Sequence, residues 1–154
     1  MDALTTGRFL SVIPDAEITA ADRILVCSGK IGHELRAERE RRAEASTAIV
    51  LLEELYPFPA RALARELERL ARAREIVWVQ EEPANMGALF FVQPRLQQVA
   101  GRRPVRSVKR TASASPATGS MKAHALEQAA LVALAFGGHE RAPRRSGQPA
   151  VQDT

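Results

Sequence analysis

The chain has 154 residues, of which 45% are hydrophobic and 26% are charged, and its formal net charge is +4. This size and composition fit one globular domain with a hydrophobic core, so we do not expect a second full domain. The first residues lack the basic segment and long apolar run of a secretory signal, and no apolar stretch approaches the roughly 20 residues that span a bilayer, so we expect a cytoplasmic protein with no membrane partner.

Short apolar runs recur along the chain at a spacing that suits successive βαβ units. The runs at 24–27, 48–52 and 76–79 are continuously apolar, as in parallel strands that are covered on both faces. The run at 104–108 is mixed and begins with a proline, which suits an edge strand.

Helical patterns separate and follow these strands. Residues 31–44 predict a charged surface helix, and residues 60–73 predict a helix with leucines on one face. A third helix should follow Gly87 and be kinked by Pro94, and the Ala- and Leu-rich segment 121–136 predicts a fourth. These elements predict an α/β fold, an open and mostly parallel sheet of about four to five strands with flanking helices.

We divide the chain into three parts on composition. Residues 1–22 form a lead-in segment, residues 23–138 form the α/β domain, and residues 139–154 form a basic tail. We expect the tail to be disordered, because it contains almost nothing that a core could bury.

The positive charge of the chain is concentrated in one segment. Residues 95–124 contain seven Lys and Arg and no Asp or Glu, so this segment has a charge of +7 and the remainder a charge of −3. Such a segment could bind an anionic ligand, an acidic partner domain or nucleic acid, or it could be a solvated surface. We expect no nucleic acid binding, because no aromatic residue between Arg95 and Lys122 could stack on bases.

The loops that follow the carboxyl ends of parallel strands form the functional edge of such a sheet. Residues 28–30 there could be a tight turn or an anion site at a helix N-terminus. Glu81, Glu82 and Asn85 could form a rigid corner or an interface loop in which a glutamate reaches a basic group on another domain.

The segment 111–120 is the best anion-binding candidate of the chain. Lys109 and Arg110 precede it and Lys122 follows it, and Thr118 or Ser120 would cap the next helix.

The residues show no self-sufficient active site. The single cysteine, Cys27, lies in an apolar run, which excludes a disulfide and a cysteine-based metal site. The three histidines have no metal-ligand spacing, and no Ser-His-Asp order or nucleophile elbow can be assembled. We therefore expect no catalytic, cofactor-binding or metal-binding residue in this chain.

Motifs in a fixed order give the chain a resemblance to a known family. They are Cys27-Ser28-Gly29-Lys30, Glu53-Glu54-Leu55-Tyr56-Pro57-Phe58-Pro59, Trp78-Val79-Gln80-Glu81-Glu82-Pro83-Ala84-Asn85-Met86-Gly87 and the segment 113–120. With them, residues 4–136 resemble the C-terminal domain of the decarboxylating component of 2-oxoglutarate dehydrogenase, which has a transketolase C-terminal-like fold.

The resemblance implies a large homodimeric parent enzyme of the tricarboxylic acid cycle. Such an enzyme decarboxylates 2-oxoglutarate on thiamine diphosphate and Mg²⁺ and passes the succinyl group to the lipoyl arm of dihydrolipoyl succinyltransferase. The Gly-Asp-Gly to Asn segment that binds thiamine diphosphate in the family does not occur in this sequence. We therefore expect a split subunit or a fragment that does not catalyse alone and serves assembly and partner docking.

Some members of actinobacterial type carry a regulatory acetyl-CoA site. By motif position, Arg8, Ser11 and Arg61 would match three of its residues, whereas Ala62 replaces a second arginine and Glu54 a glutamine. Both replacements weaken the binding of an anionic ligand.

The alternative is a free-standing regulatory domain that binds a nucleotide or acyl-CoA anion. If the chain is instead a domain of a dimer, we expect it to expose a larger apolar patch than a monomer tolerates.

Overall fold

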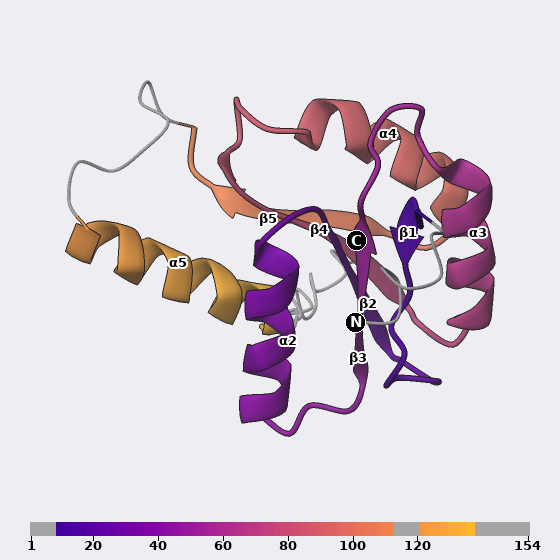
Figure 1. Ribbon diagram of the computed structural model, residues 1–154, viewed down its shortest axis with the longest axis horizontal. Coiled ribbons are helices and arrows are strands. Elements are labelled where there is room, and N and C mark those ends of the chain that lie inside the picture. Colours follow the sequence, from indigo (N-terminus) through magenta and orange to yellow (C-terminus); the bar gives the residue numbers. More distant parts are fainter. Residues whose placement is uncertain (1–8, 113–120, 138–154) are drawn as a thin grey trace, which may run out of the picture.

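The protein is built around a five-stranded sheet (Figure 1). The computed structural model describes residues 9–112 and 121–137, and within these ranges the strand order is β1-β3-β2-β4-β5. The strands are β1 (Val12–Ile13), β2 (Arg23–Cys27), β3 (Thr47–Leu52), β4 (Glu75–Pro83) and β5 (Val105–Arg110). Only β1 is antiparallel to its neighbour; β2, β3, β4 and β5 are parallel. The predicted open and mostly parallel sheet is confirmed.

Helices cover both faces of the sheet, as Figure 1 shows. They are α2 (Ile31–Arg41), α3 (Ala60–Arg69), α4 (Leu89–Ala100) and α5 (Met121–Phe136). The helices α3 and α4 pack on one face, and α2 and α5 pack on the other. The predicted α/β fold with flanking helices is therefore confirmed.

The core consists of two apolar layers that share the strands. In β2, the side chains of Ile24 and Val26 belong to the α3–α4 layer, whereas Leu25 and Cys27 belong to the α2–α5 layer. Successive strand residues point to opposite faces, and here both faces are buried. This explains why the strand is continuously apolar and does not alternate with polar residues.

Helix α2 approaches β3 so closely that only glycine fits at one position. A Cβ atom on Gly32 would lie 2.7 Å from Leu51 Cδ2, which is inside the van der Waals contact distance. The close approach fixes the start of α2 over the end of the sheet.

The structure differs from the sequence prediction at several boundaries. β4 continues to Pro83 through a register irregularity after Val79, so Glu81 and Glu82 lie in the strand and not in a loop. Pairing between Pro83 and Arg110 of β5 holds this extension. The helix predicted at 31–44 ends at Arg41.

The lead-in segment contributes to the sheet, which was not anticipated. Val12 and Ile13 pair with Leu52 and Leu51 to form the antiparallel edge strand β1. Residues 113–120 and the tail 139–154 lie outside the described residues.

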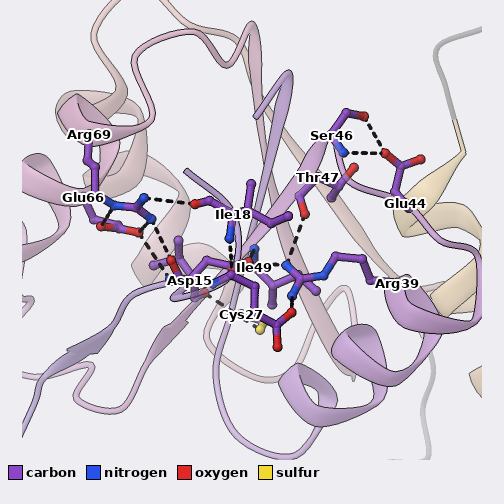
Figure 2. Close-up of polar contacts among 12 residues, drawn as sticks. Asp15, Ile18, Cys27, Arg39, Glu44, Ser46, Thr47, Ile49, Glu66 and Arg69 are labelled. Carbon is purple, nitrogen blue, oxygen red and sulfur yellow. Dashed lines mark hydrogen bonds and ion pairs between the residues drawn. The ribbon is translucent and has the colours of Figure 1, made fainter. Parts of the chain in front are cut away.

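A buried ion pair attaches the same segment to α2 (Figure 2). Arg39 of α2 donates hydrogen bonds to the carboxylates of Asp15 and Glu17, and the side chains of Asp15 and Arg39 are 2% and 5% exposed. Asp15 also accepts hydrogen bonds from the backbone N–H groups of Glu17 at 3.0 Å and Ile18 at 3.2 Å. The carboxylate of Asp15 thus stabilises the turn that follows it and also binds Arg39 of α2.

Candidate functional site

Polar side chains from four elements and one turn meet at the carboxyl edge of the sheet. We call this group the edge cluster; it consists of Lys30, Glu34, Glu81, Arg110, His124, Glu127 and Gln128. They come from the turn after β2, from α2, from the extended end of β4, from β5 and from α5. The cluster lies where the functional edge was predicted.

Gln128 is the centre of the edge cluster. Its Nε2 donates to Glu34 Oε2 at 2.7 Å and to Glu81 Oε1 at 2.5 Å, and its Oε1 accepts from Arg110 Nη2 at 3.0 Å. One amide therefore bridges two carboxylates and an arginine, which joins α5 to α2, β4 and β5.

Arg110 is held by α5 and is not free to bind an anion. Its Nη2 lies 3.2 Å from His124 Nδ1, its Nη1 lies 3.6 Å from Glu127 Oε2, and the side chain is only 12% exposed. Its Nε is buried and has no hydrogen-bond partner among the described residues. Arg110 thus acts mainly as a link between the end of β5 and the first half of α5.

Lys30 is an exposed cation of the edge cluster. Its Nζ lies 2.7 Å from Glu34 Oε1, and this hydrogen bond together with the charges of Glu34 and Glu81 raises the pKa of Lys30. Burial alone would raise the pKa of Glu34, but the hydrogen bonds from Lys30 and Gln128 lower it overall. Both groups are therefore charged at neutral pH.

The edge cluster contains more negative than positive charge. Three glutamates face one lysine and one arginine, so its charge is −1 when His124 is neutral. In the described part of the chain, no group of three or more His, Cys, Asp or Glu is placed to hold a metal ion. The arrangement fits a charge-compensated junction between elements better than a site for a phosphate.

A buried glutamine fixes the corner that follows β4. Gln80 accepts a hydrogen bond from Trp78 Nε1 at 2.9 Å and donates to the carbonyl oxygens of Glu82 and Pro83, each at 3.2 Å, and of Met86 at 2.9 Å. These bonds satisfy carbonyl groups that a turn leaves without ladder partners. The Gln80 side chain thus ties the end of β4 to the turn at Met86. Whether this motif serves as an interface loop stays a prediction.

Gly87 closes this corner next to Glu82. Its φ is +69°, which is strained for other residues, and a Cβ atom would lie 3.0 Å from Glu82. Asn85 is exposed on the same turn.

The predicted site residues do not all come together. Glu81 and Arg110 meet through Gln128, whereas Glu82 is exposed and Lys109 is partly buried on β5. Arg8, Ser120 and the side chain of Lys122 lie outside the described residues.

The residues matched by motif position to an acyl-CoA site lie on another part of the molecule. The carbonyl oxygen of Ser11 accepts hydrogen bonds from the backbone N–H groups of Glu53 at 3.0 Å and Glu54 at 3.3 Å. Ser11 lines a shallow hollow of about 490 Å³ with Arg65 of α3, while Arg61 is exposed on α3 outside the lining. Of the two matched residues that the structure describes, Ser11 lines this hollow and Arg61 does not.

The sequence prediction missed Gln80 and Gln128. Gln80 carried a signal, because a polar residue two positions after a buried tryptophan shares its face and can satisfy the indole N–H. The sequence gives no comparable signal for Gln128, which is simply a polar residue in an Ala- and Leu-rich helix.

Comparison with known proteins agrees with the resemblance found in the sequence. The family described as 2-oxoglutarate dehydrogenase C-terminal matches residues 1–136. The 2-oxoglutarate dehydrogenase E1 component of Cupriavidus necator is 43% identical over 137 residues, which cover 86% of this chain and 14% of that protein. Those of Brucella anthropi and Brucella ovis are 46% identical over 120 residues, covering 75% of this chain and 12% of each. The chain thus spans a small fraction of the length of these curated relatives.

Proposed function

The chain belongs to the 2-oxoglutarate dehydrogenase C-terminal family, and on that premise we propose that it is the C-terminal domain, or a separate small subunit, of a 2-oxoglutarate dehydrogenase E1 component. In this role it contributes to assembly and partner docking and does not catalyse alone. The observation that carries the proposal is the match of residues 1–136 to this family, together with relatives of which the chain covers only 12–14%.

The proposed parent enzyme decarboxylates 2-oxoglutarate in the tricarboxylic acid cycle. Thiamine diphosphate supplies the carbanion chemistry of that reaction when it is bound. The remaining E1 domains and a dihydrolipoyl succinyltransferase are the proposed partners, and a homodimer is the proposed assembly.

The described residues of this chain do not fit the Mg²⁺ ion of the parent enzyme. A Mg²⁺ site needs a set of free oxygen ligands, and the described ranges contain no acidic group of that kind. Two edge-cluster carboxylates, those of Glu34 and Glu81, are already bound by Gln128. We therefore assign no step of the reaction to these residues and place the cofactors in the preceding domains.

The rigid core supports a role in assembly. The sheet is covered on both faces, and Gln80, Gln128 and Arg39 fix the corner, the last helix and the lead-in segment. Such a domain presents fixed surfaces to its neighbours. No helix in the described part is long and apolar enough to cross a membrane. As part of the proposed parent enzyme, the protein would lie in the cytoplasm.

The proposal is tested by reconstitution. The chain is mixed with the Cupriavidus necator E1 component from which the matched C-terminal region has been removed, and 2-oxoglutarate-dependent reduction of ferricyanide is followed. We expect activity in the mixture and none in either part alone; the intact relative serves as the positive control. If a folded truncated partner neither binds the chain nor gains activity, the proposal is wrong.

A further inference from the structure

An aromatic surface lies at one end of the α3–α4 layer. We define it by Tyr56 and Phe58 from the loop between β3 and α3, and by Phe90, Phe91 and Arg95 from α4. Tyr56 is 83% exposed and Phe90 is 73% exposed, so two large aromatic side chains are open to solvent here.

The aromatic surface is preorganised by contacts among its own members. The ring of Phe91 lies 6.4 Å from the rings of both Tyr56 and Phe58, in tilted and edge-on arrangements. The guanidinium carbon of Arg95 lies 3.8 Å from the Phe91 ring centroid, and Arg95 Nη1 donates to the Phe91 carbonyl oxygen at 2.7 Å. Phe58 and Phe91 also pack against the core. The loop and the helix are thereby held together at Phe91. Tyr56 and Phe90, which precedes Phe91 on α4, are both exposed.

Apart from Arg95, the segments that carry this surface are uncharged. Residues 55–60 and 83–94 contain no Asp, Glu, Lys or Arg, although 26% of the chain is charged. The exposed positions of α4 are Phe90, Gln93, Pro94, Gln97 and Gln98. Depletion of charge with enrichment of aromatic residues and arginine is typical of the centre of a protein interface.

The position of the surface indicates which partner covers it. In relatives that are about seven times longer than the match, the preceding domains enter this domain from its N-terminal side. Phe9, the first described residue, is 72% exposed and lines a hollow with Ala62 and Arg65 of α3. Helix α3 begins at Ala60, directly after the aromatic loop. Phe9 and the aromatic surface therefore both adjoin α3.

We propose that the aromatic surface docks on the preceding domains of the E1 component. This inference rests on the proposed function and names the contact through which it operates. The partner surface should be apolar at its centre, should accept the rings of Tyr56 and Phe90, and should offer a hydrogen-bond acceptor to the phenol hydroxyl of Tyr56.

Single substitutions at exposed positions test the contact. Phe90→Ser and Tyr56→Ser are titrated against the truncated E1 component described above, after its fold has been checked by thiamine diphosphate binding. Leu134→Ser is the matched control, because Leu134 is 62% exposed on α5, which packs on the opposite face of the sheet. Far-ultraviolet circular dichroism and the thermal midpoint establish that each variant is folded.

We expect Phe90→Ser and Tyr56→Ser to raise the dissociation constant at least tenfold and Leu134→Ser to change it less than twofold. If the unchanged chain and all variants bind equally, the docking inference is wrong and the proposed function stands. An equal loss in the control would also overturn the inference, because the effect would not be specific to this surface. If the unchanged chain does not bind the folded partner, the proposed function fails and the inference fails with it.

Sedimentation of the chain alone separates a second copy from the E1 partner. Self-association that Phe90→Ser abolishes, together with unaltered binding of the partner, would assign the surface to a homodimer and overturn the proposal. A monomeric chain that binds the partner through this surface supports it.

Discussion

The carboxylate of Asp15 accepts a hydrogen bond from the backbone N–H of Ile49 at 2.7 Å. Strand β1 ends at Ile13, and Pro14 has no N–H with which to continue the ladder. The side chain of Asp15 therefore takes over the role of a strand partner for β3. It links the lead-in segment, the sheet and α2 through the same carboxylate that binds Arg39.

Replacing Asp15 should destabilise the protein strongly. Asp15→Ala leaves the buried guanidinium of Arg39 without its buried partner and the Ile49 N–H without an acceptor, so we expect the free energy of unfolding to fall by about 3–5 kcal/mol. Urea unfolding followed by tryptophan fluorescence measures this change.

Glu17 provides the matched control for this prediction. Its carboxylate binds the same Arg39 but is 78% exposed, so Glu17→Ala should cost less than about 1 kcal/mol. If Asp15→Ala and Glu17→Ala lower the free energy of unfolding equally, the larger effect that we expect from the buried carboxylate is contradicted.

The parallel part of the fold could be predicted because its sequence signal is local. Buried parallel strands such as Arg23–Cys27 are short apolar runs, and they were recognised as such. Strand β1 has two residues and therefore shows no periodicity. The end of β4 contains Glu81 and Pro83, which both disfavour a strand, and only pairing with β5 overrides that preference.

The edge cluster could be predicted only in outline. Topology brought Glu81 and Arg110 to the same edge of the sheet, as expected. The bridge between them depends on Gln128, which lies 47 residues from Glu81 and 94 residues from Glu34 in the sequence. No spacing rule connects residues so far apart in the sequence. The sequence therefore does not show that the positive charge of Arg110 is balanced by the glutamates of the edge cluster.

Glu75 should make the stability depend on pH in the acid range. Its carboxylate binds Arg23 Nε at 2.5 Å and Arg106 Nε at 2.9 Å. Burial alone would raise the pKa of Glu75, but the hydrogen bonds from Arg106 and Arg23 lower it overall. Since the folded pKa lies below the unfolded value of about 4.3, the stabilisation is complete above that value and is lost as the pH falls through the folded pKa.

The measurement is the difference in free energy of unfolding between the unchanged chain and Glu75→Gln from pH 7 to pH 2.5. We expect a constant difference above about pH 5 that shrinks below about pH 4. Glu68→Gln is the control, because Glu68 is exposed and has no ion pair within the described residues. A difference that grows as the pH falls would contradict the predicted direction.

Cys27 should be inert in the folded protein. The side chain is fully buried, and burial raises the pKa of the thiol to about 12. The reactive species is the thiolate, so we expect no reaction with a disulfide reagent at pH 8 until the chain unfolds. Because Cys27 is the single cysteine, the release of thionitrobenzoate reports on it alone.

An exposed thiol at a nearby position calibrates this experiment. Lys30 is 72% exposed, so a variant that combines Lys30→Cys with Cys27→Ala should react within seconds to minutes in buffer. If the unchanged chain reacts at a similar rate, the α2–α5 layer opens readily. The prediction that buried Cys27 is inert would then be wrong.

Gln128 should determine the pKa of Glu34 and the attachment of α5. Gln128→Leu removes the donor from Glu34 and Glu81 and the acceptor from Arg110, so we expect a loss of about 1–3 kcal/mol at pH 7. The variant should also raise the pKa of Glu34, because burial still opposes its charge while one stabilising hydrogen bond is gone. Carboxyl-carbon NMR titration measures that pKa directly.

The loss caused by Gln128→Leu should fade toward acid pH, because a protonated Glu34 no longer needs a donor. Gln93→Leu is the matched control, since Gln93 is an exposed glutamine of α4 outside the edge cluster and its replacement should leave the pKa of Glu34 unchanged. Amide hydrogen exchange should become faster in α5 of Gln128→Leu and remain unaltered in α3. If the pKa of Glu34 does not move while α5 loosens, Gln128 acts through packing alone and the bridge between the two carboxylates contributes nothing.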